Sequence, residues 1–396
     1  MSQGLQLRAC LVRLALGLAV AISPALLMAQ VTSPPQKPEG QTISLPKKPD
    51  YQIPSPPQKP GDYIISKPDP QRFERQLGRV SLPVARGVRL RVDNRTSGRI
   101  TVHGWDRDII EAHAFSERGD EVLIVGQRDD DGPKGIFIKA DYASRDTPDT
   151  PTLPLEVPPL ANDAVLLVHL EVNVPRYTEF EMVKVMRTNV QITGVETPLT
   201  VIGYQSDITL KDVGSVEAHT RTGAITIENA RGIADVTTST GPIRVVNSRG
   251  AVRAVSIAGA VEVRCVKGRV DVGNTQGAIE LVGIDGDVEV NAAGSNVRFS
   301  GPLSSDGRYR MKSMTGRVEM IVPGDTRGFS ATLTSYRGPV ESDFSLRPKA
   351  AAENADTTVH RLAGRFGNGS PQITLDSFEG LVKLTKVASS SLASCP

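Results

Sequence analysis

Acidic side chains recur along the middle of the chain at a spacing that could gather them on one surface. They are Asp235, Glu262, Asp271, Glu280 and Glu289. Two converging carboxylates are what a glycoside hydrolase needs, one to protonate the leaving oxygen and one to act as base or nucleophile. These acids, however, recur with the period of a repeat, as on a solvated face, and the aromatic residues that line sugar sites make up only 4% of the chain. We therefore expect no catalytic residue.

Metal chemistry has no better support in the sequence. The histidines form no HExxH motif and no i,i+4 pair, and they stand at His103, His113, His169, His219 and His360. His103 and His113 could approach each other across a hairpin, but strand histidines on the surface are the expected interpretation. The acidic run 129–131 lacks the spaced ligands and closing Glu of a calcium loop, so it predicts a solvated turn. We expect no metal and no cofactor.

The cysteines leave two interpretations open. Cys10 lies in an apolar N-terminal segment, Cys265 in the repeat described below and Cys395 next to the last residue. In an oxidising compartment the last two could pair, whereas the simpler interpretation is a small packed thiol at Cys265 and a loose tail thiol at Cys395. The sequence alone favours the unpaired thiols.

A glycine repeat organises the chain. A glycine occurs every nine residues, at Gly214, Gly223, Gly232, Gly241, Gly250, Gly259, Gly268, Gly277 and Gly286. The second and fourth residues after each glycine are mostly Val or Ile, and the residue between them is mostly charged or hydroxylic, as in Val261-Glu-Val263. This alternation predicts a short half-buried strand, with the glycine at a corner that excludes a Cβ. A fixed period of this kind indicates a repeat architecture.

Alternate units differ, which doubles the period to eighteen residues. Asn229 and Asn247 stand at equivalent positions in successive double units, followed there by Cys265 and Gly283. We therefore predict an all-β fold, a parallel β-solenoid with two short strands per coil of about 18 residues. Its coils would stack about 4.8 Å apart, placing Arg244 beside Glu262. Calcium-binding β-rolls share the nine-residue period but use paired glycines and a fixed Asp, which are missing here.

The N-terminal part predicts export. Residues 1–29 have the positive flank, apolar run and small-residue end of a secretory signal, with an uncleaved membrane anchor as the alternative. Residues 30–80 form a Pro- and Lys-rich segment, which predicts a disordered linker or stalk. We expect no membrane span after the signal segment and, at a net charge of +2, no nucleic-acid partner.

The folded part is predicted at 84–386. We expect a β-rich N-terminal cap at 84–175, including a hairpin around the 129–132 turn and a Pro-rich insertion at 146–163. Regular coils and a bulkier C-terminal cap follow at 188–386, interrupted by an insertion at 347–360, and residues 387–396 form a tail. Caps are expected because an open solenoid end exposes unpaired backbone groups.

Several separated motifs resemble a known bacterial family. They are the run 90–94, Gly98-Arg-Ile100-Thr-Val102, Gly104-Trp105-Asp106, the Thr-Gly-x-Ile units at 222–225 and 240–243, and the closing motifs Gly367-x-Gly369 and Gly380-x-Val382. Together they look like the β-strand-repeat proteins of unknown function that are often labelled “putative adhesins”. The resemblance covers roughly 84–386, implies the same fold, and brings no catalytic residues. The Pro-rich linker and the insertion at 146–163 depart from the family pattern.

The expected function is therefore non-catalytic. We expect an exported scaffold, adhesin-like, located in the periplasm or cell envelope or secreted, whose solenoid faces bind a surface, an envelope polymer or a protein partner. The alternative is a carbohydrate-active β-helix enzyme, a lyase or hydrolase.

Overall fold

The structure is a computed structural model that describes residues 76–77, 79–94, 98–116, 123–128, 135–141, 168–185, 187–348 and 359–395. All of them belong to one unit, Ser66–Pro396. The signal segment predicted at 1–29, the linker up to residue 75, the acidic turn, the insertion at 146–163 and residues 349–358 lie outside the described residues. Two short strands begin at Gln76 and Arg79, within the stretch expected to be linker.

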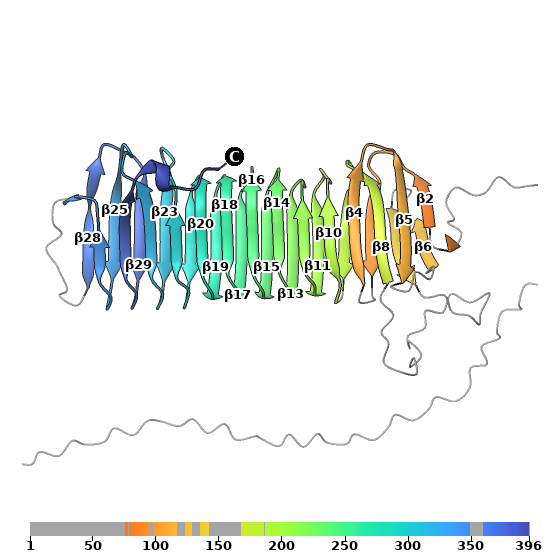
Figure 1. The fold of residues 1–396 in the computed structure, drawn as a ribbon, viewed down its shortest axis with the longest axis horizontal. Coiled ribbons are helices and arrows are strands. Elements are labelled where there is room, and N and C mark those ends of the chain that lie inside the picture. The colour runs from red at the N-terminus through yellow and green to blue at the C-terminus, as the bar shows by residue number, and fades with distance from the viewer. Residues whose placement is uncertain are drawn as a thin grey trace, which may run out of the picture. The chain divides into compact units, whose positions relative to one another are not determined.

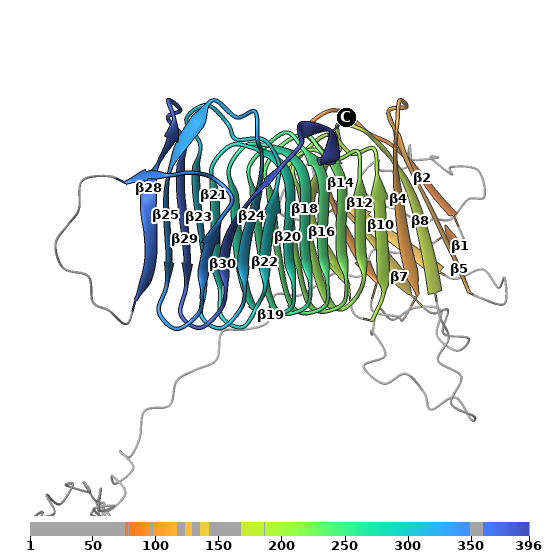
Figure 2. The same cartoon turned by 60° about the vertical axis from the view of Figure 1, so that its left-hand side comes forward.

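Through the regular coils, strands that follow one another in the chain alternate between two facing sheets, called sheet A and sheet B here (Figures 1 and 2). Sheet A contains, in spatial order, β1 (Gln76–Leu77), β6 (Leu123–Arg128), β7 (Gly135–Asp141), β3 (Arg89–Asn94), β9 (Glu179–Val185), β11 (Leu199–Gln205), β13 (Val216–Thr222), β15 (Ala234–Thr240), β17 (Val252–Ala258), β19 (Val270–Gln276), β21 (Val288–Ala292), β23 (Arg308–Ser313), β29 (Gln372–Ser377), β25 (Gly328–Ser335), β28 (His360–Gly367) and β27 (Arg347–Pro348). Sheet B contains β2 (Arg79–Pro83), β5 (Ile109–Ser116), β8 (Val168–Pro175), β4 (Arg99–Trp105), β10 (Asn189–Thr193), β12 (Ile208–Lys211), β14 (Ile225–Ala230), β16 (Ile243–Ser248), β18 (Val261–Lys267), β20 (Ile279–Asp285), β22 (Val297–Ser300), β24 (Val318–Pro323), β30 (Val382–Val387) and β26 (Val340–Ser342).

The register repeats from coil to coil. Ile225 of β14 pairs with Ile243 of β16, which pairs with Val261 of β18, and the paired residues Arg244 and Glu262 are 18 positions apart. The strands are parallel, and their apolar side chains face the space between the sheets, where Val263 has no exposed surface. The prediction of an all-β parallel solenoid with two strands per coil is confirmed.

Glycine occupies the corners for the two reasons expected from the sequence. At Gly241 the backbone has φ +139°, and a Cβ would lie 2.1 Å from the carbonyl oxygen of Gly223 in the preceding coil. The conformation disfavours an L side chain, and the close approach of the two backbones leaves no room for one. The glycine period is therefore the period of the coil corners.

The N-terminal end does not follow chain order. The coil formed by β7 and β8 lies outside the β3–β4 coil, and β9 and β10 continue the solenoid from its other side. β6 and β7 form the antiparallel hairpin predicted from the sequence. β2 pairs with β5 in the same antiparallel sense and lies at the edge of sheet B.

The C-terminal end is interleaved. β29 lies between β23 and β25, and β30 lies between β24 and β26, so the last coil fills a space between two coils formed earlier in the chain. Beyond it, antiparallel β28 covers β25. The aromatic rings of Phe329, Phe344 and Phe366 pack there with centroids 5.0 to 5.5 Å apart. These bulky side chains close this end of the core.

The tail is not loose, so the favoured interpretation of the cysteines was wrong. After β30 the chain makes a short 3-10 turn, η1 (Ser389–Ser391), and turns back along the coils (Figure 1). Cys395 forms a disulfide with Cys265 of β18, with Cα atoms 5.3 Å apart. The sequence could not show this pairing, because nothing in it says that the tail reverses direction.

Candidate functional site

Small polar side chains are buried inside the corners that follow the sheet A strands, one above another along the solenoid. Thr220, Ser256 and Asn274 are buried there. The Thr220 and Ser256 hydroxyls donate to the carbonyl oxygens of Ser206 (3.2 Å) and Gly241 (3.4 Å). Because these bonds satisfy the polar groups of the turn, the corner keeps one conformation from coil to coil. The next residue along the chain then faces water.

Several of those outward residues are large and apolar, and smaller or polar residues separate some of them: Arg221, Ser239, Thr275 and Ala293. In the described part of the chain six large apolar side chains are exposed, and five of them occupy this one corner column, with exposed fractions of 42% to 61%. In spatial order they are Tyr204, Ile257, Met314, Phe378 and Tyr336. The sixth, Ile233, lies at the opposite corner, directly before β15. We call the column of five the ridge.

The interleaved last coil makes the ridge continuous at its C-terminal end. β29 lies between β23 and β25 (Figure 1). The register of these strands therefore places Phe378 between Met314 and Tyr336. The Phe378 backbone N–H donates to the Met314 carbonyl (3.2 Å), and the rings of Phe378 and Tyr336 are 5.6 Å apart. Three large apolar side chains therefore follow one another on adjacent coils.

Arginines accompany the aromatic residues of the ridge. The Arg337 guanidinium lies 5.1 Å from the Phe378 ring centroid and forms an ion pair with Glu379 (3.0 Å). The Arg221 guanidinium lies 5.3 Å from the Tyr204 ring and donates to its hydroxyl (2.7 Å). Each cation is attracted to the face of its ring, which holds the aromatic side chain in place. The ridge thus presents ordered aromatic rings, and at its C-terminal end the charge of the ordering arginine is compensated by Glu379.

The acids considered as catalytic candidates are divided between the two sheets. Asp235, Asp271 and Glu289 lie on sheet A, whereas Glu262 and Glu280 lie on sheet B. Their side chains alternate with the inward-facing apolar residues, so the two groups face outward on opposite sides of the solenoid. The structure therefore does not bring the five carboxylates to one site.

Most of these acids are bound by arginines on neighbouring coils. Glu262 contacts Arg244, as predicted, and also Arg264, and Arg264 bridges to Glu280 (3.4 Å). On sheet A, Arg253 pairs with Asp235 (3.3 Å) and Arg269 with Glu289 (2.6 Å). Such ladders link one coil to the next, and exposed pairs of this kind contribute at most about 1 kcal/mol each.

His103 on β4 and His113 on β5 are strand residues, as expected, and they do not approach each other across a hairpin. β8 lies between β4 and β5, so His103 pairs with Asn173 and His113 with Glu171. The His113 ring instead lies 5.0 Å from Phe115. Across the described ranges no three His, Cys, Asp or Glu side chains are grouped closely enough to hold a metal ion.

The shifted pKa values belong to structural contacts. Arg308 donates to Asp287 from its backbone N–H (2.9 Å) and its guanidinium (2.8 Å), and the backbone bond is the main reason why the pKa of Asp287 is lowered. The stabilisation is present above the ordinary value of 3.8 and is lost as the pH falls through the folded-state value. Burial raises the pKa of Tyr309 in the core, and the hydrogen bond to Asp108 raises that of Tyr177.

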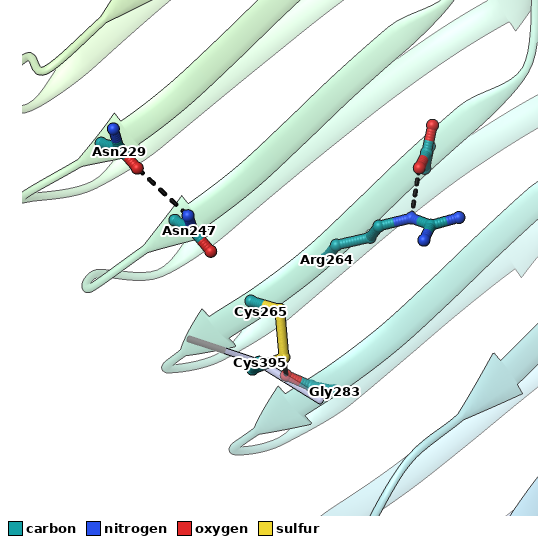
Figure 3. The surroundings of a disulfide bond; sticks show 7 residues. Asn229, Asn247, Arg264, Cys265, Gly283 and Cys395 are labelled. Carbon is teal, nitrogen blue, oxygen red and sulfur yellow. Dashed lines mark hydrogen bonds and ion pairs between the residues drawn. A yellow bond between two sulfur atoms is a disulfide. The ribbon is translucent and has the colours of Figure 1, made fainter. Parts of the chain in front are cut away.

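A groove of about 1070 Å³ runs along the corner that follows the sheet B strands. Its lining includes Asn229, Asn247, Cys265 and Gly283, and the C-terminal tail lies in it. Figure 3 shows the disulfide at this place, between the end of β18 and the tail.

Comparisons with known proteins leave the family open. No family model and no curated protein matches the chain. A crystal structure described as a “putative cell adhesion protein” from Clostridium sporogenes ATCC 15579 aligns with 79% of this chain and 100% of that one, at 9% sequence identity and a TM-score of 0.21. At that score the likeness supports neither fold nor function. Within the described residues no helix is long and apolar enough to cross a membrane.

Proposed function

We propose that the protein is a non-catalytic, exported scaffold that binds a component of the cell envelope through the ridge. The observation that carries the proposal is the placing of five of the six exposed large apolar side chains of the described residues in one corner column. Single exposed apolar residues are common on any surface, but a contiguous group marks an interaction site. Met314, Phe378 and Tyr336 form such a group.

The chemistry of the ridge favours a protein partner. Aromatic residues, Met and Arg are the residues enriched at protein interfaces, and these types make up the C-terminal part of the ridge. Because Arg337 orders the Phe378 ring before binding, little side-chain freedom remains to be lost on association. We therefore infer a protein partner with an apolar surface.

Two features support export. The apolar segment at 1–29 has the pattern of a secretory signal. The Cys265–Cys395 bond is of a kind that persists in oxidising compartments and is rare in the cytosol. An exported scaffold would meet its partner in the periplasm, in the envelope or outside the cell.

Binding to isolated bacterial envelope fractions tests the proposal. We expect the purified protein to co-sediment with the fractions, and Phe378→Ser combined with Tyr336→Ser to lower the bound fraction at least about tenfold, because truncating central aromatic anchors removes most of the interface energy. Ile233→Ser is the matched control, an equally exposed apolar residue at the other corner, and should bind normally.

Two results would contradict the assignment. Unchanged binding of the ridge variant would show that the ridge is not the contact surface, and loss of binding only on deletion of 31–80 would make the basic linker the attachment segment. Release of reducing sugars or unsaturated products from a polysaccharide panel, abolished by Asp271→Asn, would favour the enzyme alternative.

A further inference from the structure

The corner opposite the ridge contains a column of residues in the left-handed conformation. Asp212, Asn229, Asn247, Cys265 and Gly283 succeed one another there with φ of 53°, 59°, 58°, 57° and 62°. Asn, Asp and Gly tolerate this conformation, whereas other side chains adopt it at a cost. Cys265 is the member of the column that local backbone preference does not explain.

The side chains of the column form a ladder that stops at Cys265. The Asn229 amide donates to the Asp212 carboxylate (2.8 Å), and the Asn247 amide donates to the Asn229 carbonyl oxygen (3.1 Å; Figure 3). At the next coil the side chain of Cys265 is instead bonded to Cys395. The disulfide therefore takes the place of a ladder contact.

The following coil leaves room for the second sulfur. Gly283 lies beside Cys265 on the next coil. A Cβ on Gly283 would lie 2.3 Å from the Cys395 Sγ. The sulfur itself lies 3.7 Å from the Gly283 carbonyl oxygen, a van der Waals contact because a disulfide sulfur carries no proton. Cys265 therefore adopts a backbone conformation that is unfavourable for cysteine, and the glycine on the next coil leaves space for Cys395. Both features accommodate the disulfide.

Apart from the disulfide, the tail is weakly held. The Ser389 hydroxyl donates to Asp325 (2.6 Å), and the backbone bonds of Ser391 and Leu392 stay within the tail itself. Leu392 is half-buried, while Ala393, Ser394 and Cys395 are exposed. The tail covers part of the groove, whose lining includes the buried side chains of Val266 and Ile284.

We propose that Cys265–Cys395 is an exchangeable disulfide and that Cys395 is the atom at which a partner thiol attacks. Cys395 is exposed, whereas Cys265 is half-buried in the column. Exposed disulfides are the labile ones, because the rate of exchange depends on access to the sulfur that is attacked. The partner is a dithiol protein or a small thiol, and the site is independent of the ridge.

A partner thiolate attacks Cys395 Sγ, a mixed disulfide forms, the Cys265–Cys395 bond breaks, and Cys265 leaves as a thiolate that takes a proton from water. With a dithiol partner, its second thiolate then attacks its own sulfur in the mixed disulfide and releases Cys395. The protein disulfide is reduced by two electrons and the dithiol is oxidised. The freed tail can leave the groove, while β18 keeps its backbone bonds to β16 and β20.

The test uses the folded protein with reduced glutathione, quenched by N-ethylmaleimide and mapped by mass spectrometry of peptides, which separates Cys10 from the other two. We expect glutathione on Cys395 and maleimide on Cys265, at a rate within about tenfold of that in denaturant. Far-UV circular dichroism should stay unchanged. Cleavage by chymotrypsin after Leu392 should rise at least about tenfold on reduction, because a released tail enters the protease site.

Two variants distinguish release of the tail from general unfolding of the protein. Cys265→Ser should show the high Leu392 cleavage without any reductant, and Ser394→Ala, beside the disulfide, should cleave like the unmodified protein. Resistance of the bond to glutathione unless denaturant is present would overturn the proposal. So would glutathione found on Cys265, or reduction that leaves cleavage at Leu392 unchanged.

Discussion

Val263→Asp is expected to abolish folding. Val263 has no exposed surface, and it stacks between Val245 and Leu281 of the neighbouring coils. A carboxylate there would lose its water with no cation to pair with, and the stacked column would lose a methyl-rich contact on both sides. Together these effects should cost more than about 4 kcal/mol, which is a large share of the stability of a typical domain. Thermal unfolding followed by circular dichroism measures the effect.

The matched control is the adjacent outward residue. Glu262→Gln removes the charge that contacts Arg244 and Arg264, but the side chain keeps its length and the site remains partly exposed. We expect a change of no more than about 1 kcal/mol. Equal melting temperatures for the two variants would contradict the solenoid, since in it neighbouring residues of one strand face opposite sides.

Gly241→Val is expected to give the second large loss. The backbone there has φ +139°, and a Cβ would lie 2.1 Å from the Gly223 carbonyl oxygen. Strain and overlap with backbone cannot be relieved by moving a flexible side chain, so we expect a loss of at least about 2 kcal/mol in the free energy of unfolding. Urea unfolding curves provide the measurement.

Gly273→Ala is the control for this substitution. Gly273 lies within β19, where a Cβ would meet only the Val255 methyl groups at 3.7 Å, an ordinary contact. We expect a change of less than about 1 kcal/mol in either direction. If Gly273→Ala were as destabilising as Gly241→Val, close backbone approach at the corners would not be the reason why glycine recurs every nine residues.

The sequence predicts the regular coils well because their information is local. The glycine corners, the inward Val263 and the outward Glu262 all follow from a nine-residue window and the two-residue period of a strand. Once two strands make one coil, the pairing of Arg244 with Glu262 follows as well. The N- and C-terminal caps could be expected from bulkier residues, but their strand order could not.

The ridge could not be predicted, because it depends on which coil each strand joins. Phe378 lies between Met314 and Tyr336 only because β29 enters between two coils that precede it in the chain. No spacing in the sequence records that choice. The strand order also decides that His103 and His113 do not meet, because an intervening strand, β8, separates them.

The disulfide left a trace in the sequence that could have been followed. Asn229 and Asn247 mark a position with left-handed backbone, where a cysteine such as Cys265 is unusual. Gly283, at the same position of the next coil, has no side chain to fill the space beside Cys265. These two facts indicate that something occupies the space. That the occupant is Cys395 required the course of the tail.

Photo-cross-linking at the ridge tests most directly whether the ridge is the contact surface. Benzoylphenylalanine would replace Phe378 in one sample and Ile233 in another, and each protein would be irradiated with envelope fractions. We expect a discrete adduct from position 378 and none from position 233. Equal adducts from both positions, or an adduct from 233 alone, would contradict this expectation.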